Sequence, residues 1–291
     1  MSSLRPLAPL DTAALFPRLH VELLALLRAL EPADWERPTV AGAWRVRDVA
    51  VHLLDVMLRK LAAHRDGHRL APDGPAESYE DVLALINRLN AGGVAFGARL
   101  SPRLLTDLLE VTGRWLGDFV AALDPDAPAI FPVGWAGESR SDNRFDTARD
   151  YTEHWHHQMQ IRVAVGERGR PETLLARIYL VPLLETAVRA LPHAYRAVPA
   201  PEGTAVVLRA VDGPWPDGEP ALAWTVRREG GRWRLHGGEA ARPAARAEAS
   251  PDVLWRLLFN ALPADRARGA VAASGPEELL APLWHARSVM V

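Results

Sequence analysis

A change in the spacing of apolar residues near position 200 constrains the fold of this chain more than any other feature. Before that point, leucines and other apolar residues recur at the spacing of one helical face. After it come short runs with β-strand character, namely "TAVVLRAV", "ALAWTVRRE" and "GRWRLHGG". The segment "AVPAPEG", 197–203, is typical of a linker between the two parts. The sequence therefore predicts a helical part followed by a mixed one.

Helical periodicity and its breaks give the expected elements of the first part. Asp11 is placed to cap the first helix, and Gly- and Pro-rich residues 66–78 should end the second. The third and fourth stretches could also be one long helix that breaks near Ser101-Pro102. The expected helices are 11–31, 44–65, 78–99, 101–123, 144–166 and 173–191.

The second part should combine strands with two helices. Gly230-Gly231 predicts a hairpin turn, and Ser250 with Pro251 predicts the start of a helix over 250–262. A last helix should begin near Pro276 or Glu277. We therefore expect an α-helical bundle over residues 1–197 and a small α+β domain over 204–291.

Composition excludes several classes of function. The net charge of −2 gives no electrostatic reason to expect a nucleic acid or an anionic membrane as partner. We find no apolar run long enough to span a bilayer, no signal peptide and no Gly-rich phosphate loop, so we expect a cytoplasmic protein without a nucleotide cofactor. The absence of cysteine excludes disulfides, thiolate metal sites and a cysteine nucleophile. A monomer or a homodimer is expected.

The segment "EHWHHQMQIRVAVG", 153–166, concentrates three of the ten histidines beside a glutamate. Glu153 and His157 are four residues apart and share a helical face that continues through apolar Ile161. A carboxylate and an imidazole on an inward face must be paired, hydrogen-bonded or bound to metal. A third ligand from another helix, for which His52 is the candidate, would leave one coordination position open.

Other interpretations of these residues stay open at this point. His52 could be a hydrogen-bonded core histidine, and Glu153 with His157 could form an ordinary salt bridge. His154, with Asp150 as its partner, could replace His157 as a ligand.

The remaining candidates surround this segment. We expect His156 on the opposite side of the helix, and Arg162 beside the core face, where it could bind a substrate carboxylate or bridge a neighbouring acid. Trp44 and Trp155 should pack around the site, and Trp135 could line the mouth of the pocket.

Two blocks resemble the mycothiol-dependent maleylpyruvate isomerase family of the DinB-like superfamily. The first block is "ADWERPTVAGAWRVRDVAVHLLD", 33–55, and the second is the histidine-rich segment. The residues that carry the resemblance are Trp35, Trp44, Val46, Asp48 and His52 in the first block, and Glu153, Trp155, His157, Ala164 and Gly166 in the second. The C-terminal part resembles, more loosely, the sterol-carrier-like domain that many members append.

The resemblance implies a divalent metal, usually zinc, held by His52, Glu153 and His157, with nickel, cobalt or manganese as other candidates. Gln160 stands where the family usually carries an aspartate, so the choice of substrate or thiol could differ.

The implied activity is that of an enzyme that uses a low-molecular-weight thiol of the mycothiol or bacillithiol type. This thiol would be the cosubstrate for isomerisation of, or S-transfer to, a small electrophile. Because the chain has no cysteine, the thiolate must come from the cosubstrate, and His154 or His156 would carry protons. The alternatives are a hydrolase that uses metal-bound water and a non-enzymatic metal-binding module.

Overall fold

The structure, a computed structural model, describes residues 4–69, 78–213 and 222–289. By their internal packing, the residues divide into two compact units. The bundle unit comprises Asp11–Pro132 and Ser141–Leu174, and the sheet unit comprises Met1–Leu10, Val133–Arg140 and Leu175–Val291. These units follow packing rather than linkers along the chain, so the domain bounds 1–197 and 204–291 stay a prediction.

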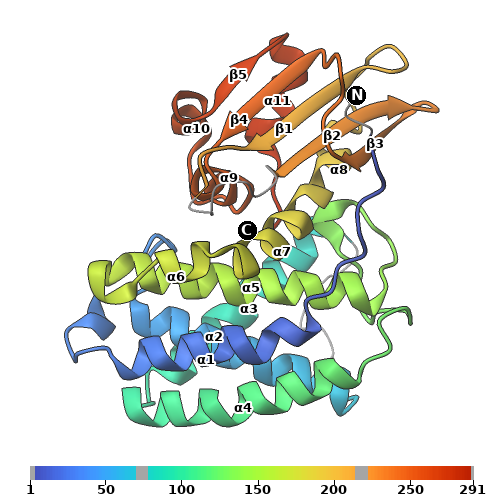
Figure 1. Ribbon diagram of the computed structural model, residues 1–291. Helices are drawn as coiled ribbons and strands as arrows, with labels where there is room; N and C mark the ends of the chain where they lie inside the picture. The colour runs from blue at the N-terminus through green and yellow to red at the C-terminus, as the bar shows by residue number, and fades with distance from the viewer. Residues whose placement is uncertain (1–3, 70–77, 214–221, 290–291) are drawn as a thin grey trace. The chain divides into compact units, whose positions relative to one another are not determined.

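The bundle unit is built from long helices, with α2 at its centre (Figure 1). Helix α2 packs against α3, α4 and α5, while α1 packs against α4 and α5. The helices are α1 (Phe16–Arg28), α2 (Val46–Lys60), α3 (Tyr79–Gly97), α4 (Pro102–Ala122) and α5 (Asn143–Ala164). Short helical segments accompany them: η1 (Ala13–Leu15) precedes α1, η2 (Asp34–Glu36) lies between α1 and α2, η3 (Leu61–Arg65) continues α2 as a π-helix, and η5 (Gly166–Gly169) follows α5.

These helices confirm the predicted stretches, with differences at the ends. The stretches 78–99 and 101–123 are separate helices, because the Ser101 hydroxyl accepts the Leu104 N–H at 3.3 Å and starts α4. The prediction for Asp11 is wrong, because the first turn begins after Thr12 and has no side-chain cap. Most of the predicted loop 66–78 lies outside the described residues.

Helix α5 differs from its neighbours in burying polar side chains on nearly every side. Ordinary bundle helices keep such residues on a solvent-facing side. The buried polar residues of α5 are Asp146, Thr147, Thr152, His154, His156, His157, Gln158, Gln160 and Arg162. Because each buried polar group needs a partner, this helix is where a polar site is expected.

The sheet unit contains a five-stranded mixed sheet of order β3-β2-β1-β4-β5, in which only β1 and β4 pair in parallel. Gly230 and Gly231 both have positive φ, as the predicted hairpin between β2 and β3 requires. Strands β4 and β5 were not predicted, because their alanine-rich sequences have little strand preference. The strands are β1 (Ala205–Ala210), β2 (Leu222–Glu229), β3 (Arg232–Gly237), β4 (Ala245–Ala249) and β5 (Ala272–Ser274).

Short helices complete this unit. The Ser250 hydroxyl accepts the Val253 N–H at 3.3 Å and caps α9 as predicted. The single helix predicted over 173–191 is wrong, because Ala176 has a non-helical ψ of 140° and separates α6 from α7. The elements are η4 (Gly134–Ala136), α6 (Glu172–Leu175), which crosses the boundary between the units, α7 (Arg177–Ala187), η6 (Val188–Ala190), α8 (Leu191–Tyr195), α9 (Pro251–Leu258), α10 (Ala264–Ala270), which was not predicted, and α11 (Glu277–His285).

A helical N-terminal region followed by a mixed sheet with helices confirms the predicted fold class at this level. Throughout the ranges that the structure describes, no helix is both long and apolar enough to cross a bilayer.

Candidate metal centre

The two predicted ligand blocks meet inside the bundle unit. His52 comes from α2, while Glu153 and His157 come from successive turns of α5. One potential ligand atom from each residue lies within 4.8 Å of the other two. Among the residues that the structure describes, these form the group of histidine and acidic side chains that could hold a metal ion.

Helix caps fix where these side chains lie. The Asp48 carboxylate accepts the Arg45 N–H at 2.9 Å and starts α2 one turn before His52. At the start of α5, the Asp142 carboxylate accepts the Phe145 N–H at 2.8 Å. Because both helices begin at defined residues, the positions of the three side chains along them are fixed.

Aromatic packing covers the two imidazoles of the cluster. The rings of His52 and His157 have centroids 4.5 Å apart and an interplanar angle of 76°. The Trp44 ring lies 5.0 Å from His52 and 6.5 Å from His157. Trp44 therefore packs against both imidazoles, as expected from the sequence.

The hydrogen bonds of His157 determine what its second nitrogen faces. His157 Nδ1 lies 2.8 Å from Gln160 Oε1, and an amide oxygen can only accept, so Nδ1 carries the proton. Nε2 faces Glu153 Oε2 at 3.3 Å, which is within ion-pair distance. In a neutral ring both atoms are acceptors and could share a cation, whereas in a protonated ring Nε2 would donate to the carboxylate in the salt bridge that the sequence left open. The geometry of this pair fits either arrangement.

His52 is held in the form that binds metals. Its side chain is 4% exposed, and burial, reinforced by the nearby His157, lowers the pKa of His52 to about 2. The ring is therefore neutral near pH 7, and neutral imidazole is the metal-binding form. Its buried Nδ1 has no hydrogen-bond partner within the described chain. A buried nitrogen without a partner is costly unless a ligand occupies it.

His156 lies beside the cluster and not on the opposite side of the helix, so that expectation was wrong. Its ring centroid is 5.3 Å from that of His157, and its Nε2 lies 2.8 Å from Gln160 Nε2. The physical reason is helical spacing, since residues 156 and 160 share a face four residues apart. This same spacing would have indicated that Gln160 touches the histidine segment, a contact that the sequence analysis missed.

His154 faces another part of the bundle. Its ring lies 5.5 Å from Phe16 and lines a cavity together with His20 and Met57. Burial lowers the pKa of His154 to about 4, so its ring is neutral near pH 7.

The proposed alternative partner of His154, Asp150, forms ion pairs of 2.8 Å with both Lys60 and Arg149. Burial alone would raise the pKa of Asp150, but these two cations outweigh it and lower the pKa to about 2. Asp146 joins the same buried network through Lys60 and Arg149. Asp150, the carboxylate that the alternative ligand pair would need, is therefore already paired with two cations.

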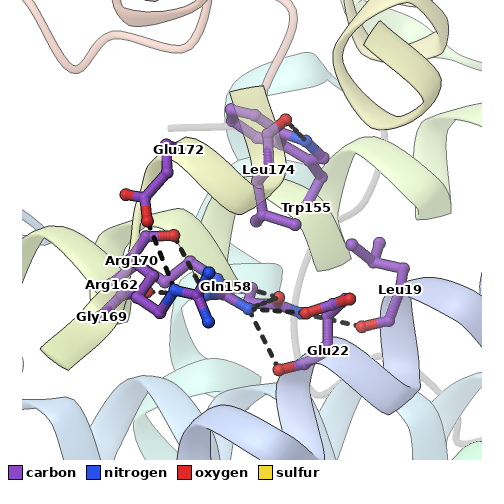
Figure 2. Close-up of polar contacts among 9 residues, drawn as sticks. All are labelled: Leu19, Glu22, Trp155, Gln158, Arg162, Gly169, Arg170, Glu172 and Leu174. Carbon is purple, nitrogen blue, oxygen red and sulfur yellow. Dashed lines mark hydrogen bonds and ion pairs between the residues drawn. The ribbon is translucent and has the colours of Figure 1, made fainter. Parts of the chain in front are cut away.

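Arg162 is enclosed by acceptors at the end of α5 (Figure 2). Its guanidinium donates to Gly169 O at 2.6 Å, to Glu22 O at 3.1 Å and to Gln158 Oε1 at 3.1 Å. Glu22 Oε2 lies 3.5 Å away, which is the bridge to a neighbouring acid that the sequence left open. The side chain thus joins α5 to α1, and its donors are directed to these acceptors rather than to the cluster.

The two other tryptophans have different surroundings. Trp155 is fully buried and donates from Nε1 to Leu174 O at 3.2 Å (Figure 2). Trp135 is buried within the sheet unit. The expectations that Trp155 packs around the site and that Trp135 lines the pocket mouth stay predictions.

The fold and the site define a helical-bundle protein in which two helices bring two imidazoles and one carboxylate close enough together to hold one metal ion. Residues 16–162, half of the chain, match the family described as the mycothiol maleylpyruvate isomerase N-terminal domain. The chain belongs to this family, and the matched range includes all three candidate ligands. The resemblance expected from the sequence is therefore confirmed, as is the expectation that the chain belongs to a family of enzymes.

Solved structures to which this chain is similar include that of the mycothiol-dependent maleylpyruvate isomerase. It shares 13% sequence identity with this chain over 90% of this chain and 91% of that one, with a TM-score of 0.49. A histidine-to-alanine mutant of that enzyme gives the same identity and coverage, with a TM-score of 0.48. No curated protein matches this chain in sequence.

Proposed function

We propose that this protein is a divalent-metal-dependent enzyme that uses a low-molecular-weight thiol of the mycothiol type to isomerise a small electrophilic alkene. His52, Glu153 and His157 would hold the metal. The family's name supplies the thiol and the substrate class, since it refers to mycothiol and to maleylpyruvate. Two nitrogen ligands and one carboxylate oxygen suit zinc and leave a coordination position open. Nickel, cobalt and manganese are the other candidates.

The observation that carries the proposal is the convergence of His52, Glu153 and His157, with one potential ligand atom of each within 4.8 Å of the other two. The buried and unpaired Nδ1 of His52 supports it independently. A divalent cation bound there would be shared by all three side chains.

When bound, such a metal removes the proton of a coordinated thiol and so supplies a thiolate near neutral pH. Such a thiolate would add to one alkene carbon as the π electrons moved toward the conjugated carbonyl. Rotation about the resulting single bond and loss of the thiolate would then give the other isomer. Isomerisation therefore needs no net proton or electron.

The chain's own residues would shape this chemistry around the cluster. Trp44 covers the rings of His52 and His157 and excludes water from that side. His156 accepts from Gln160 at Nε2 and therefore holds its own proton at Nδ1. Of the two predicted proton carriers, we assign the role to His156, because its ring lies beside the cluster while His154 lines the cavity near Phe16. Protonation of the substrate carbon, with the sulfur retained, would give S-transfer instead.

A cobalt-substituted full-length chain tests the proposal. Mycothiol, bacillithiol and glutathione are added in turn, and we expect a sulfur-to-cobalt charge-transfer band with at least one of them. The same thiol should then be required for cis–trans isomerisation of maleylpyruvate, followed by absorbance. The His157→Ala variant should give neither signal. A stable thioether product would show S-transfer, whereas ester or amide hydrolysis without thiol, and no band, would support the hydrolase.

We also propose the finer features that the sequence analysis predicts. These are a DinB-like topology for the bundle, a sterol-carrier-like topology for the C-terminal part, a cytoplasmic location, and a monomeric or homodimeric state. Solution scattering of the full-length chain would give its oligomeric state.

A further inference from the structure

We infer that Gln160 is a positioning residue for His157, and that one side-chain amide links His156 and His157 into a relay with defined tautomers. This inference rests on the proposed function, since it concerns how His157 is prepared to bind a metal. Gln160 touches none of the proposed ligand atoms, so it would act only through the imidazole beside it.

The relay consists of three side chains of α5, in which Gln160 forms one hydrogen bond to His157 and one to His156. Gln160 is 6% exposed, and it lies three residues after His157 and four after His156. Its Oε1 is 2.8 Å from His157 Nδ1, and its Nε2 is 2.8 Å from His156 Nε2. Both ends of one buried amide are thus used by two neighbouring imidazoles.

The orientation of this amide decides which nitrogen of His157 carries the proton. With the oxygen toward His157, the proton is on Nδ1, and the Nε2 lone pair faces Glu153. A reversed amide would offer an N–H to Nδ1 and would move the ring proton to Nε2. In that form Nε2 could not bind a metal. The observed orientation therefore prepares His157 for coordination.

His156 is the reason that the amide has a preferred orientation. The amide N–H needs an acceptor when it is buried, and His156 Nε2 provides it. An acidic side chain could accept from His157 equally well but could not donate to His156. A carboxylate at position 160 would therefore force His156 into the opposite tautomer, with its proton on Nε2. The glutamine thus assigns the same tautomer to both rings, which a carboxylate cannot do.

Metal titration of the metal-free full-length chain tests the positioning role. Gln160→Leu removes the acceptor of His157, and Co²⁺ affinity should fall about 10–100-fold, as for other residues that orient a ligand histidine. Gln160→Glu keeps an oxygen at that point and should restore the affinity. The matched control is Gln158→Leu, because Gln158 is equally buried on α5 but donates to Leu19 O at 2.9 Å (Figure 2). This control should bind Co²⁺ as tightly as the wild type.

The tautomer of His156 provides a readout that general destabilisation would not move. Long-range ¹H–¹⁵N spectra of the metal-free chain should show the His156 proton on Nδ1 in the wild type. In Gln160→Glu the proton should move to Nε2, while Gln158→Leu should leave it on Nδ1.

The outcomes separate the two proposals. If the wild-type chain does not bind Co²⁺, the metal centre is wrong and the positioning role falls with it. If the wild type binds while Gln160→Leu binds equally tightly, the positioning role alone is overturned. If Gln160→Leu does not fold, Gln160→Glu decides, because an unchanged His156 tautomer in that variant would exclude the relay.

Discussion

The imidazoles of His52 and His157 meet edge to face, with ring centroids 4.5 Å apart, although one belongs to α2 and the other to α5. Two protonated rings would repel at this distance, and His157 is indeed one of the causes that lower the pKa of His52, after burial. Two imidazoles that converge beside a carboxylate are suited to sharing one metal ion, because neutral imidazole is the metal-binding form. The contact therefore fits a metal centre.

Removing either imidazole should abolish metal binding. The purified wild-type chain is expected to carry about one divalent ion, and His52→Ala or His157→Ala should weaken binding beyond the roughly 100-fold typical of residues around the ligands. Elemental analysis after dialysis measures the content. Retention of the full metal content by either variant would exclude that histidine as a ligand.

His154→Ala is the matched control for this prediction. It removes a buried histidine from the same helix, but one that lines the cavity near Phe16. Its metal content should equal that of the wild type. A loss of metal in His154→Ala, with full content in His157→Ala, would restore the alternative in which His154 is the ligand.

The candidate ligands could be predicted because each lies in a short sequence pattern that can be recognised without the structure. Glu153 and His157 are one turn apart on a helix that the sequence identifies, and His52 lies in a block that resembles a family. The surroundings were harder to predict because they depend on rotamers. Helical spacing places His156 beside Gln160, but it does not show that Arg162, also on α5, turns toward Glu22 on another helix.

Arg162 should matter for stability rather than for metal binding. Arg162→Met leaves the Gly169 and Glu22 carbonyls and Gln158 without their buried donor, and it should lower the free energy of unfolding by about 3–5 kcal/mol. Urea denaturation measures this change. Arg170→Met is the control, because that exposed side chain forms only a solvent-screened pair and should cost under about 1 kcal/mol. Equal stability of the two variants would contradict the structural role of Arg162.

Because α3 packs closely against α2, replacing Gly97 with alanine should destabilise the fold. A Cβ atom at Gly97 would collide with Val51 Cγ1, next to His52 in the chain, whereas nothing lies within 4 Å of a Cβ at Gly92. Gly97→Ala should therefore cost about 1–3 kcal/mol of stability. Gly92→Ala should instead gain about 0.5–1 kcal/mol through helix preference. Thermal unfolding followed by circular dichroism compares them, and a stabilised Gly97→Ala would show that α3 and α2 are not this close.

His20 should make the fold sensitive to mild acid. Burial lowers the pKa of His20 from 6.5 to about 4, although a hydrogen bond to the Leu109 backbone works in the opposite direction. Between these two values the unfolded chain binds a proton that the folded chain does not, so stability is lost as the pH falls from 6.5 to 4. The loss from this residue should be about 3 kcal/mol. His20→Gln should be correspondingly less sensitive in urea unfolding between pH 7.5 and 4.5. If the wild type and His20→Gln lost the same unfolding free energy between pH 7.5 and 4.5, His20 would be protonated in the folded chain.

Elements of the fold could be predicted where a residue type strongly favours one local structure. Gly230-Gly231 and Ser250 gave a hairpin and a cap that the structure contains. Alanine-rich β4 has no such signal, because its place depends on pairing with β1, which is distant in sequence. The break at Ala176 is also invisible in the sequence, since alanine is the best helix former and yet takes a non-helical ψ of 140° there.

The three candidate ligands come from only two helices, α2 and α5. An ion bound by all three would cross-link α2 and α5 and would bind the folded chain alone. Resistance to unfolding would then rise with the supply of free ion, by about 4.1 kcal/mol at a thousand times the dissociation constant. In a cell with little of that ion, the activity of the protein would be lost. The amount of the protein would also fall, because the apo chain would unfold more often and be degraded sooner.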